Sequence, residues 1–277
     1  MSVTMKVTYY MHSGFSCAAD RVLLIFDYWL GERQELARHL RIDPAEFADY
    51  EEVYVFISHS HPDHFDPVVF DWQKDSRVTY IVGYDMPVGV GGHRMYPGDR
   101  LSLSPKVKVQ AFDSTDLGVS FLVQLGNIRI FHAGDLNFWH WREESTVAEI
   151  EEADVEFRRC VEPIAAEPPA DVCFFPVDPR QGRLYDAGVN YFIMAAKPRL
   201  LIPMHFWGHA EMMLDFARRA GNRATEVYAM VQPREELNIT FSDTGFMTIT
   251  PVTRPRPRAV LPDASDPFSE SDLPVSF

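Results

Sequence analysis

The sequence contains few cysteines and no long apolar run. Its three cysteines, Cys17, Cys160 and Cys173, lie far apart among 277 residues and form no CxxC pair, which argues against a disulfide framework and favours a reducing cytoplasm. No apolar run approaches the ~20 residues that a membrane-spanning helix needs. The N-terminus also lacks the apolar core and cleavage site of a signal peptide. We therefore expect a cytoplasmic protein without a membrane partner.

Basic side chains are scarce relative to acidic ones. The sequence has 26 Lys and Arg against 40 Asp and Glu, a formal net charge of −14. Such a surface repels phosphate backbones, so we expect a small-molecule substrate rather than nucleic acid. Hydrophobic residues make up 46% of the chain, which permits a sizeable core and excludes disorder of the whole chain. The oligomeric state is left open.

Hydrophobic patterning changes between the two halves of the chain. Apolar runs and alternation predict strands at 6–10, 22–26, 53–57, 78–82, 107–111, 120–125 and 128–132. Helices are predicted from about 145 to 164, at 186–196 and at 209–220, with strands at 172–177 and 200–204 between them. Thr146 followed by Glu149 predicts a capping box on the first helix. Strands covered by helices indicate an α/β fold built in layers.

The last segment differs in composition from the rest. From Arg254 the sequence reads RPRPRAVLPDASDPFSESDLPVSF, rich in proline and acidic residues. Such a segment buries too little apolar surface to offset the entropy lost on ordering. We predict a single domain over residues 1–253 and a disordered tail over 254–277.

The segment His59-Ser60-His61-Pro62-Asp63-His64 carries the strongest chemical signal. Ten histidines in 277 residues give about 0.2 per six-residue window on average, and this window holds three. The extended spacing directs His59 and His61 to the same side, and Pro62 fixes the backbone so that Asp63 and His64 can turn towards a second point. Imidazole and carboxylate groups suit Zn²⁺, Fe or Mn²⁺. The pattern therefore predicts a metal site at the end of a strand.

Two later strand ends supply further candidate ligands. Phe131-His132-Ala133-Gly134-Asp135 ends with a carboxylate that could bridge two ions, and Ile202-Pro203-Met204-His205 ends with a histidine. Each alone is weak evidence, because an Asp after Gly is usually a turn residue and a single His is usually a satisfied polar group. Their order after the histidine-rich segment gives them weight together.

With these residues the sequence resembles the metallo-β-lactamase superfamily of metallo-hydrolases. The matching elements are His59-x-His61-x-Asp63-His64, HAGD ending at Asp135 and PMH ending at His205. His12-Ser13-Gly14-Phe15, Phe26-Asp27, Tyr96-Pro97-Gly98-Asp99 and the segment 171–180 are also similar to family motifs. The resemblance spans residues 5 to about 225. It is closest to the soluble cytoplasmic branch that includes ascorbate-phosphate lactonases.

The resemblance implies a four-layer αββα sandwich with two divalent ions, zinc or else manganese or iron, at one edge between the sheets. It assigns His59 and His61 to a first metal, and Asp63, His64 and His205 to a second. Asp135 would bridge the two ions. A metal-bound hydroxide would then be the nucleophile, because the ions lower the pKa of a coordinated water.

One ligand of the family pattern is missing. The family places a third histidine on the first metal, some twenty residues before the Gly-Asp, and residues 111–118 contain none. Asp113 or Asp116 could replace it, and a carboxylate would favour Mn²⁺ or Fe²⁺. Alternatively, His140 could reach in from the loop after Asp135, or the first metal could be weak or absent.

Residues near the bridging carboxylate and the later strand ends are candidates for substrate contact and proton transfer. Asn137 and Trp139 belong to an aromatic segment that could line a substrate site or pack against the following helix. Asp178 and Arg180 could orient a polar substrate or pair with each other. His140 and Asp63 are the catalytic candidates.

These features favour a metal-dependent hydrolase that acts on an ester, lactone or phosphodiester bond of a small molecule. The missing histidine motivates the alternative, a non-hydrolytic metal-binding or redox module on the same scaffold.

Overall fold

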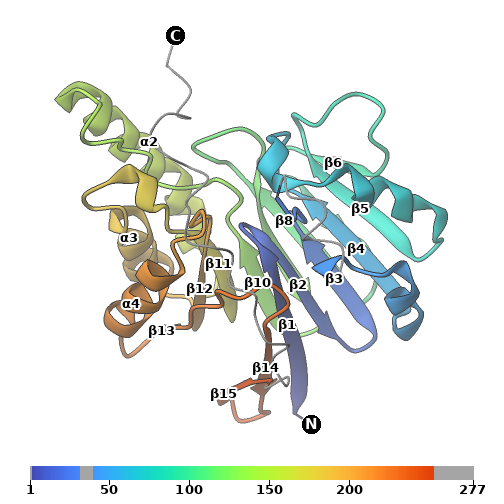
Figure 1. Cartoon of the computed structure of the whole chain (residues 1–277). Helices are drawn as coiled ribbons and strands as arrows, with labels where there is room; N and C mark the ends of the chain where they lie inside the picture. Colours follow the sequence, from blue (N-terminus) through green and yellow to red (C-terminus); the bar gives the residue numbers. More distant parts are fainter. Residues whose placement is uncertain (1, 32–39, 253–277) are drawn as a thin grey trace, which may run out of the picture.

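A computed structural model describes residues 2–31 and 40–252. Two sheets lie face to face, with helical segments outside them (Figure 1). The first sheet has the strand order β15-β14-β1-β2-β3-β4-β5-β6, and the second β13-β12-β11-β10-β9-β8-β7. This is the four-layer αββα arrangement that the resemblance implied. The tail predicted from residue 254 lies outside the described residues.

The first sheet combines strands from the two ends of the described chain. Its members are β1 (Val3–Met11), β2 (Gly14–Ala19), β3 (Val22–Phe26), β4 (Glu52–Ile57), β5 (Val78–Gly83), β6 (His93–Met95), β14 (Glu236–Phe241) and β15 (Met247–Pro251). The strands predicted at 6–10, 22–26, 53–57 and 78–82 are confirmed. β2, β6, β14 and β15 were not predicted, because they are short, rich in small residues or partly exposed.

The second sheet takes its strands from the middle of the chain. It contains β7 (Arg100–Ser102), β8 (Val107–Phe112), β9 (Ser120–Leu125), β10 (Ile128–His132), β11 (Val172–Pro176), β12 (Leu200–Met204) and β13 (Glu226–Val227). The helices α2 (Val147–Ala165), α3 (Ala187–Ala196) and α4 (Ala210–Ala220) cover its outer face (Figure 1). The predicted helices and the strands at 107–111, 120–125, 128–132, 172–177 and 200–204 are confirmed to within two residues at each end.

The helix α2 forms where the sequence predicted a helix start. Thr146 accepts from the backbone N–H of Glu149, whose side chain accepts in return from the Thr146 backbone, so the capping box is confirmed. Phe157, Cys160, Val161 and Ile164 form its buried stripe, at the spacing of one helical face. No helix in the described part of the chain has the length and apolar character to cross a bilayer.

The strand β3 is apolar at every position because both faces of the first sheet are buried there. Leu24 and Phe26 point into the core between the two sheets, whereas Leu23 and Ile25 face a second core. That second core is closed by side chains such as Trp72 from the 3-10 helices η2 (Pro44–Asp49) and η4 (Pro67–Lys74). Full burial of such a side chain contributes about 1.5–3 kcal/mol.

Parallel strands set the position of the functional edge. β3, β4 and β5 are mutually parallel, as are β10, β11 and β12. The carboxyl ends of parallel strands meet at one edge of a sheet, which is where ligands bind in α/β folds. Because both sheets contribute such strands, residues that follow β4, β10, β11 and β12 converge between them.

Candidate metal centre

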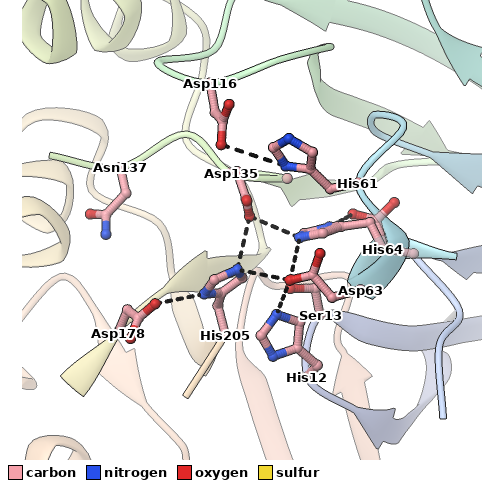
Figure 2. Close-up of polar contacts among 12 residues, drawn as sticks. His12, Ser13, His61, Asp63, His64, Asp116, Asp135, Asn137, Asp178 and His205 are labelled. Atoms are coloured by element: carbon pink, nitrogen blue, oxygen red, sulfur yellow. Dashed lines mark hydrogen bonds and ion pairs between the residues drawn. The ribbon is translucent and has the colours of Figure 1, made fainter. Parts of the chain in front are cut away.

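Eight acidic and histidine side chains converge in two groups at this edge. The inner group is His12, Asp63, His64 and His205, and the outer group is His59, His61, Asp116 and Asp135. In each group one ligand atom per residue lies within 4.8 Å of the others. Figure 2 shows most of these side chains pointing towards one another from different strand ends.

Asp135 lies between the two groups. Its Oδ1 is 3.0 Å from Nε2 of His64 and 3.3 Å from Nε2 of His205, both in the inner group. Its Oδ2 is 3.5 Å from Nε2 of His59 in the outer group. One carboxylate oxygen therefore faces each group, which is the placement that a bridging ligand requires.

Three buried histidines are each oriented by a polar neighbour behind them. Nδ1 of His64 is 2.7 Å from Oδ2 of Asp27, and Nδ1 of His205 is 3.0 Å from Oδ2 of Asp178. Nδ1 of His59 is 2.9 Å from Oγ of Ser58. Each contact holds the imidazole with Nε2 directed into the cluster. Contacts of this kind fix the ring and the tautomer of metal-binding histidines.

Asp27 acts on both groups. Oγ of Ser58 donates to Oδ2 of Asp27 at 2.6 Å, so the Ser58 oxygen is left to accept from the ring of His59. Asp27 therefore orients His64 directly and His59 through Ser58. The carboxylate is 1% exposed at the end of β3, and its backbone φ of 39° lies in the left-handed region.

Four buried ligand atoms make no well-directed hydrogen bond among the described residues. They are Nε2 of His12, His64 and His205 and Oδ1 of Asp135, and their contacts with one another or with Asp63, at 3.0–3.3 Å, are ion pairs only where the rings are protonated. Buried polar atoms without a well-directed hydrogen bond are costly, so four in one place need a shared explanation. A divalent cation would coordinate nitrogen and oxygen atoms of this kind. The donor set therefore fits a metal ion.

The electrostatics of the cluster keep the carboxylates of Asp63 and Asp135 ionised. Burial raises the pKa of Asp135, but the neighbouring His205 and His64 outweigh it and hold that pKa well below its usual range. Asp63 is also kept below the usual carboxyl range, by His12 and His64 against the effect of burial. Ionised carboxylates are the form that binds a cation.

The cluster also contains histidines that stay neutral. Burial lowers the pKa of His12 to about 3, and the nearby His205 acts in the same direction. Burial and the neighbouring His64 lower the pKa of His59 to about 4. A neutral imidazole is the form that coordinates a metal.

The two candidate replacements for the missing histidine lie differently. Oδ2 of Asp116 is 3.7 Å from Nδ1 of His61 in the outer group, and burial together with the charge of Asp135 raises the pKa of Asp116. Oδ2 of Asp113 instead accepts from Nη2 of Arg159 on α2, at 2.7 Å. The structure thus brings Asp116, and not Asp113, to the other candidate ligands.

His140 and Asn137 hold the loop after β10. Nε2 of His140 faces the carbonyl oxygen of Leu184 at 3.1 Å, and its Nδ1 accepts from the backbone N–H of Arg142. Asn137 donates through Nδ2 to Oε1 of Gln181 at 3.1 Å. Among the described residues neither side chain joins either group, because the loop uses both for its own hydrogen bonds. A catalytic role for His140 stays a prediction.

Trp139 and Asp178 adjoin His205, and Arg180 contacts Asp178. The ring of Trp139 lies 5.6 Å from that of His205, and its Nε1 donates to the backbone oxygen of Asp135 at 2.8 Å. Arg180 donates to Asp178 through Nε at 3.0 Å and Nη2 at 2.6 Å. Of the two alternatives for Asp178 and Arg180, the structure shows the mutual pair.

The sequence did not assign His12 to the ligand set. Nε2 of His12 is 3.2 Å from Oδ2 of Asp63, and its backbone oxygen accepts from the N–H of His205 at 3.2 Å. His12 and His205 have φ values of 55° and 61°. Such backbone conformations are costly for residues other than glycine and cluster at functional sites. The only sequence signal was the resemblance of the HSGF segment to a family motif.

Comparison with known proteins gives relatives in sequence but no matching family model. The chain is 25% identical over 260 residues to a protein of Desulforamulus reducens described as a UPF0173 metal-dependent hydrolase. The match covers 85% of this chain and all of that protein.

Solved structures share the fold. Igni18, a metallo hydrolase from Ignicoccus hospitalis, superposes with a TM-score of 0.62 at 18% identity, covering 86% of this chain and 99% of Igni18. The metallo-beta-lactamase fold protein YhfI from Bacillus subtilis superposes with a TM-score of 0.54 at 13% identity, covering 90% of this chain and all of YhfI. The chain therefore has the metallo-β-lactamase fold.

Proposed function

We propose that this chain is a metal-dependent hydrolase of the metallo-β-lactamase superfamily and that it cleaves an ester, lactone or phosphodiester bond of a small molecule. The observation that carries the proposal is the set of buried histidines whose Nδ1 atoms are held by Asp27, Ser58 and Asp178 while Nε2 points inward. Histidines packed this closely are best explained as metal ligands.

We propose that the inner and outer groups each hold one divalent ion, with Asp135 between them. When bound, the ions lower the pKa of water and polarise the bond under attack. Asp63, His64 and His205 would bind the inner ion, and His59, His61 and Asp116 the outer ion.

Other residues of the chain orient this machinery and border the substrate. Asp27 and Asp178 keep Nε2 of the buried histidines directed inward. Asp63, 21% exposed in its side chain, is the inner-group residue most open to substrate and is our candidate for contact with the reacting groups. Trp139 would shield one side of the site from water through its contact with His205.

Metal analysis combined with a substrate screen tests this function. Protein stripped with a chelator should regain hydrolysis of a p-nitrophenyl ester, a lactone or bis(p-nitrophenyl) phosphate when zinc, manganese or ferrous iron is restored. The His61→Ala variant should lose turnover. His93→Ala is the matched control, because His93 is an exposed histidine on β6. Tight metal binding without turnover on all three classes would reject hydrolysis.

A non-hydrolytic redox role is the second candidate. Asp116 stands in the outer group where the family pattern has a histidine, and a carboxylate favours Mn²⁺ or Fe²⁺ over Zn²⁺. Iron-loaded protein that consumes oxygen in the presence of a reductant, and fails the hydrolase screen, would support this role instead.

A further inference from the structure

Three of the five tryptophans contact the inner group and a fourth, Trp141, stacks on one of them. Trp29, Trp139, Trp141 and Trp207, which we call the tryptophan wall, are each partly exposed. The fifth, Trp72, is 3% exposed in the core beneath the 3-10 helices. A partly exposed indole beside a metal centre is characteristic of a ligand site rather than of a packed core.

The tryptophan wall touches the candidate ligands directly. The ring of Trp207 lies 4.5 Å from that of His12 and 5.9 Å from that of His205. Trp29 lies 5.5 Å from His12, and Trp139 lies 5.6 Å from His205. Three partly exposed indole rings therefore lie against the histidines of the inner group.

Within the tryptophan wall, the rings come from segments far apart in the sequence. Trp139 stacks on Trp141 with centroids 5.8 Å apart and planes inclined by 10°. Trp29 and Trp207 follow different strands of different sheets, yet their rings lie 6.2 Å apart. The fold thus brings flat apolar surfaces to one rim of the metal centre from three loops.

Arg180 adds a positive charge to this rim. Its Cζ lies 4.4 Å from the ring centroid of Trp207 and 5.9 Å from that of Trp141. Nε and Nη2 donate to Asp178, Nη1 has no acceptor among the described residues, and the side chain is 41% exposed. The guanidinium already stands over the indole faces, so a second cation would be repelled there and an anion attracted.

A second donor at the rim lacks a partner. Nε1 of Trp207 is buried without a hydrogen-bond partner among the described residues. A buried indole N–H is usually satisfied. This donor lies on the ring that Arg180 covers, so both groups beside it are donors and neither is an acceptor.

We propose that the substrate is a planar aromatic or heteroaromatic molecule carrying an anionic group, with its ring against the tryptophan wall and its anion near Nη1 of Arg180. The proposal deepens the proposed hydrolytic function and rests on it for the reaction at the metal centre. The ring supplies the stacking surface and the anion supplies the acceptor.

Binding of two matched, non-hydrolysable probes to manganese-loaded protein tests the proposal. Phenylphosphonate and cyclohexylphosphonate have the same anionic group on rings of similar size, one flat and aromatic, the other saturated. Isothermal titration calorimetry should give a Kd about tenfold lower for phenylphosphonate, the scale of one or two aromatic contacts. Trp141→Leu should bring the ratio of the two Kd values close to one. Trp72→Phe, the control, should preserve it.

A second variant distinguishes the contribution of the anionic group to binding from that of the ring. Arg180→Gln should weaken both phosphonates by a similar factor and leave their ratio unchanged. Equal affinities of the two phosphonates for the wild-type protein would overturn the proposal, whether or not the variants fold. Tighter binding of phenyltrimethylammonium than of phenylphosphonate would also overturn it, by showing a cation site.

These outcomes differ from those that test the proposed function, because binding needs no turnover. Absence of hydrolysis with the phenyl preference retained would reject the reaction and leave the ligand class standing. Hydrolysis of aryl and alkyl esters alike, with no preference in binding, would reject the ligand class alone.

Discussion

The inner and outer groups use the same side-chain types but differ in how firmly they are enclosed. In the inner group the histidines are at most 3% exposed, and carboxylates stand behind two of them. In the outer group the side chains of His61 and Asp116 are 40% and 34% exposed, and the polar group behind His59 is a serine hydroxyl. Enclosed ligands with carboxylate support hold a metal more rigidly than exposed ones.

The difference in enclosure predicts different roles for the two groups. We expect the inner ion to bind more tightly and the outer ion to exchange more readily with solvent. An open coordination position is what a catalytic metal site needs, whereas closed sites are structural.

The Asp135→Ala variant removes the carboxylate that contacts both the inner and the outer group. Because one oxygen faces each group, we expect both ions to be lost and hydrolysis to fall to background. Elemental analysis after dialysis would measure the metal, and circular dichroism would show whether the variant folds. Retention of one full ion in a folded variant would contradict the bridging position.

The Asp116→Ala variant should affect the outer group and leave the inner group unchanged. We expect the outer ion to bind at least about a hundredfold more weakly, since even contacts one shell further out are worth about 10–100-fold, while the inner ion is retained. Asp113→Ala is the matched control, because Asp113 pairs with Arg159 instead. Calorimetric titration with Mn²⁺ would measure both sites. If Asp113→Ala, rather than Asp116→Ala, lost the outer ion, the roles would be exchanged.

Asp178→Asn and Asp27→Asn compare the supports behind the histidines. Asp178 contacts His205 alone among the candidate ligands, so its loss should weaken the inner ion by about 10–100-fold and spare the outer one. Asp27 reaches His64 and, through Ser58, His59. Its replacement should therefore weaken both ions. Competition with a fluorescent chelator would resolve the two affinities, and equal effects on both sites in the two variants would refute the distinction.

We expect the smallest effect in the pH dependence of the unfolding stability of the metal-free protein. Burial opposes protonation of His205, but Asp135 and Asp178 outweigh it and raise its pKa from 6.5 to about 9. The pKa of His64 is also raised, by Asp135 and Asp27 against burial. A raised pKa in the folded state stabilises the fold fully below pH 6.5, and this contribution is lost as the pH rises towards 9.

Urea unfolding of metal-free protein should therefore show lower stability at pH 9 than at pH 6.5. Binding of Mn²⁺ should change in the opposite direction over the same range, because the ion displaces these protons. His205→Asn should reduce both slopes. A metal affinity that does not change with pH would contradict the protonation of the inner group.

Much of the metal centre could be predicted because its residues follow buried strands directly. The run from Val53 to Ile57 is apolar enough to mark β4, and the histidines come immediately after it. His12 carries no such local signal, since its contacts are with Asp63 and His205. The difference between Asp113 and Asp116 likewise depends on a side chain of α2, Arg159, which spacing alone does not place.

The parts of the fold that sequence patterning missed depend on distant partners. β14 pairs with β1, joining Val3 to Phe241, and its residues alternate only partly between buried and exposed. Half of the tryptophan wall could be predicted from the sequence, because Trp139 and Trp141 lie in one segment. Trp29 and Trp207 join them only through tertiary packing. Sequence therefore identified strands with strong local patterns but not edges formed by long-range pairing.

The contact between His12 and His205 limits when a metal ion can bind during protein synthesis. A ribosome delivers the segment from His59 to His64 long before it delivers His205, and a domain folds as a unit. For that interval the first histidines are present without the residues that complete either group. A divalent ion arriving then would meet a partial set of ligands. Loading of the finished centre therefore has to follow the arrival of His205, whose backbone N–H donates to the carbonyl oxygen of His12.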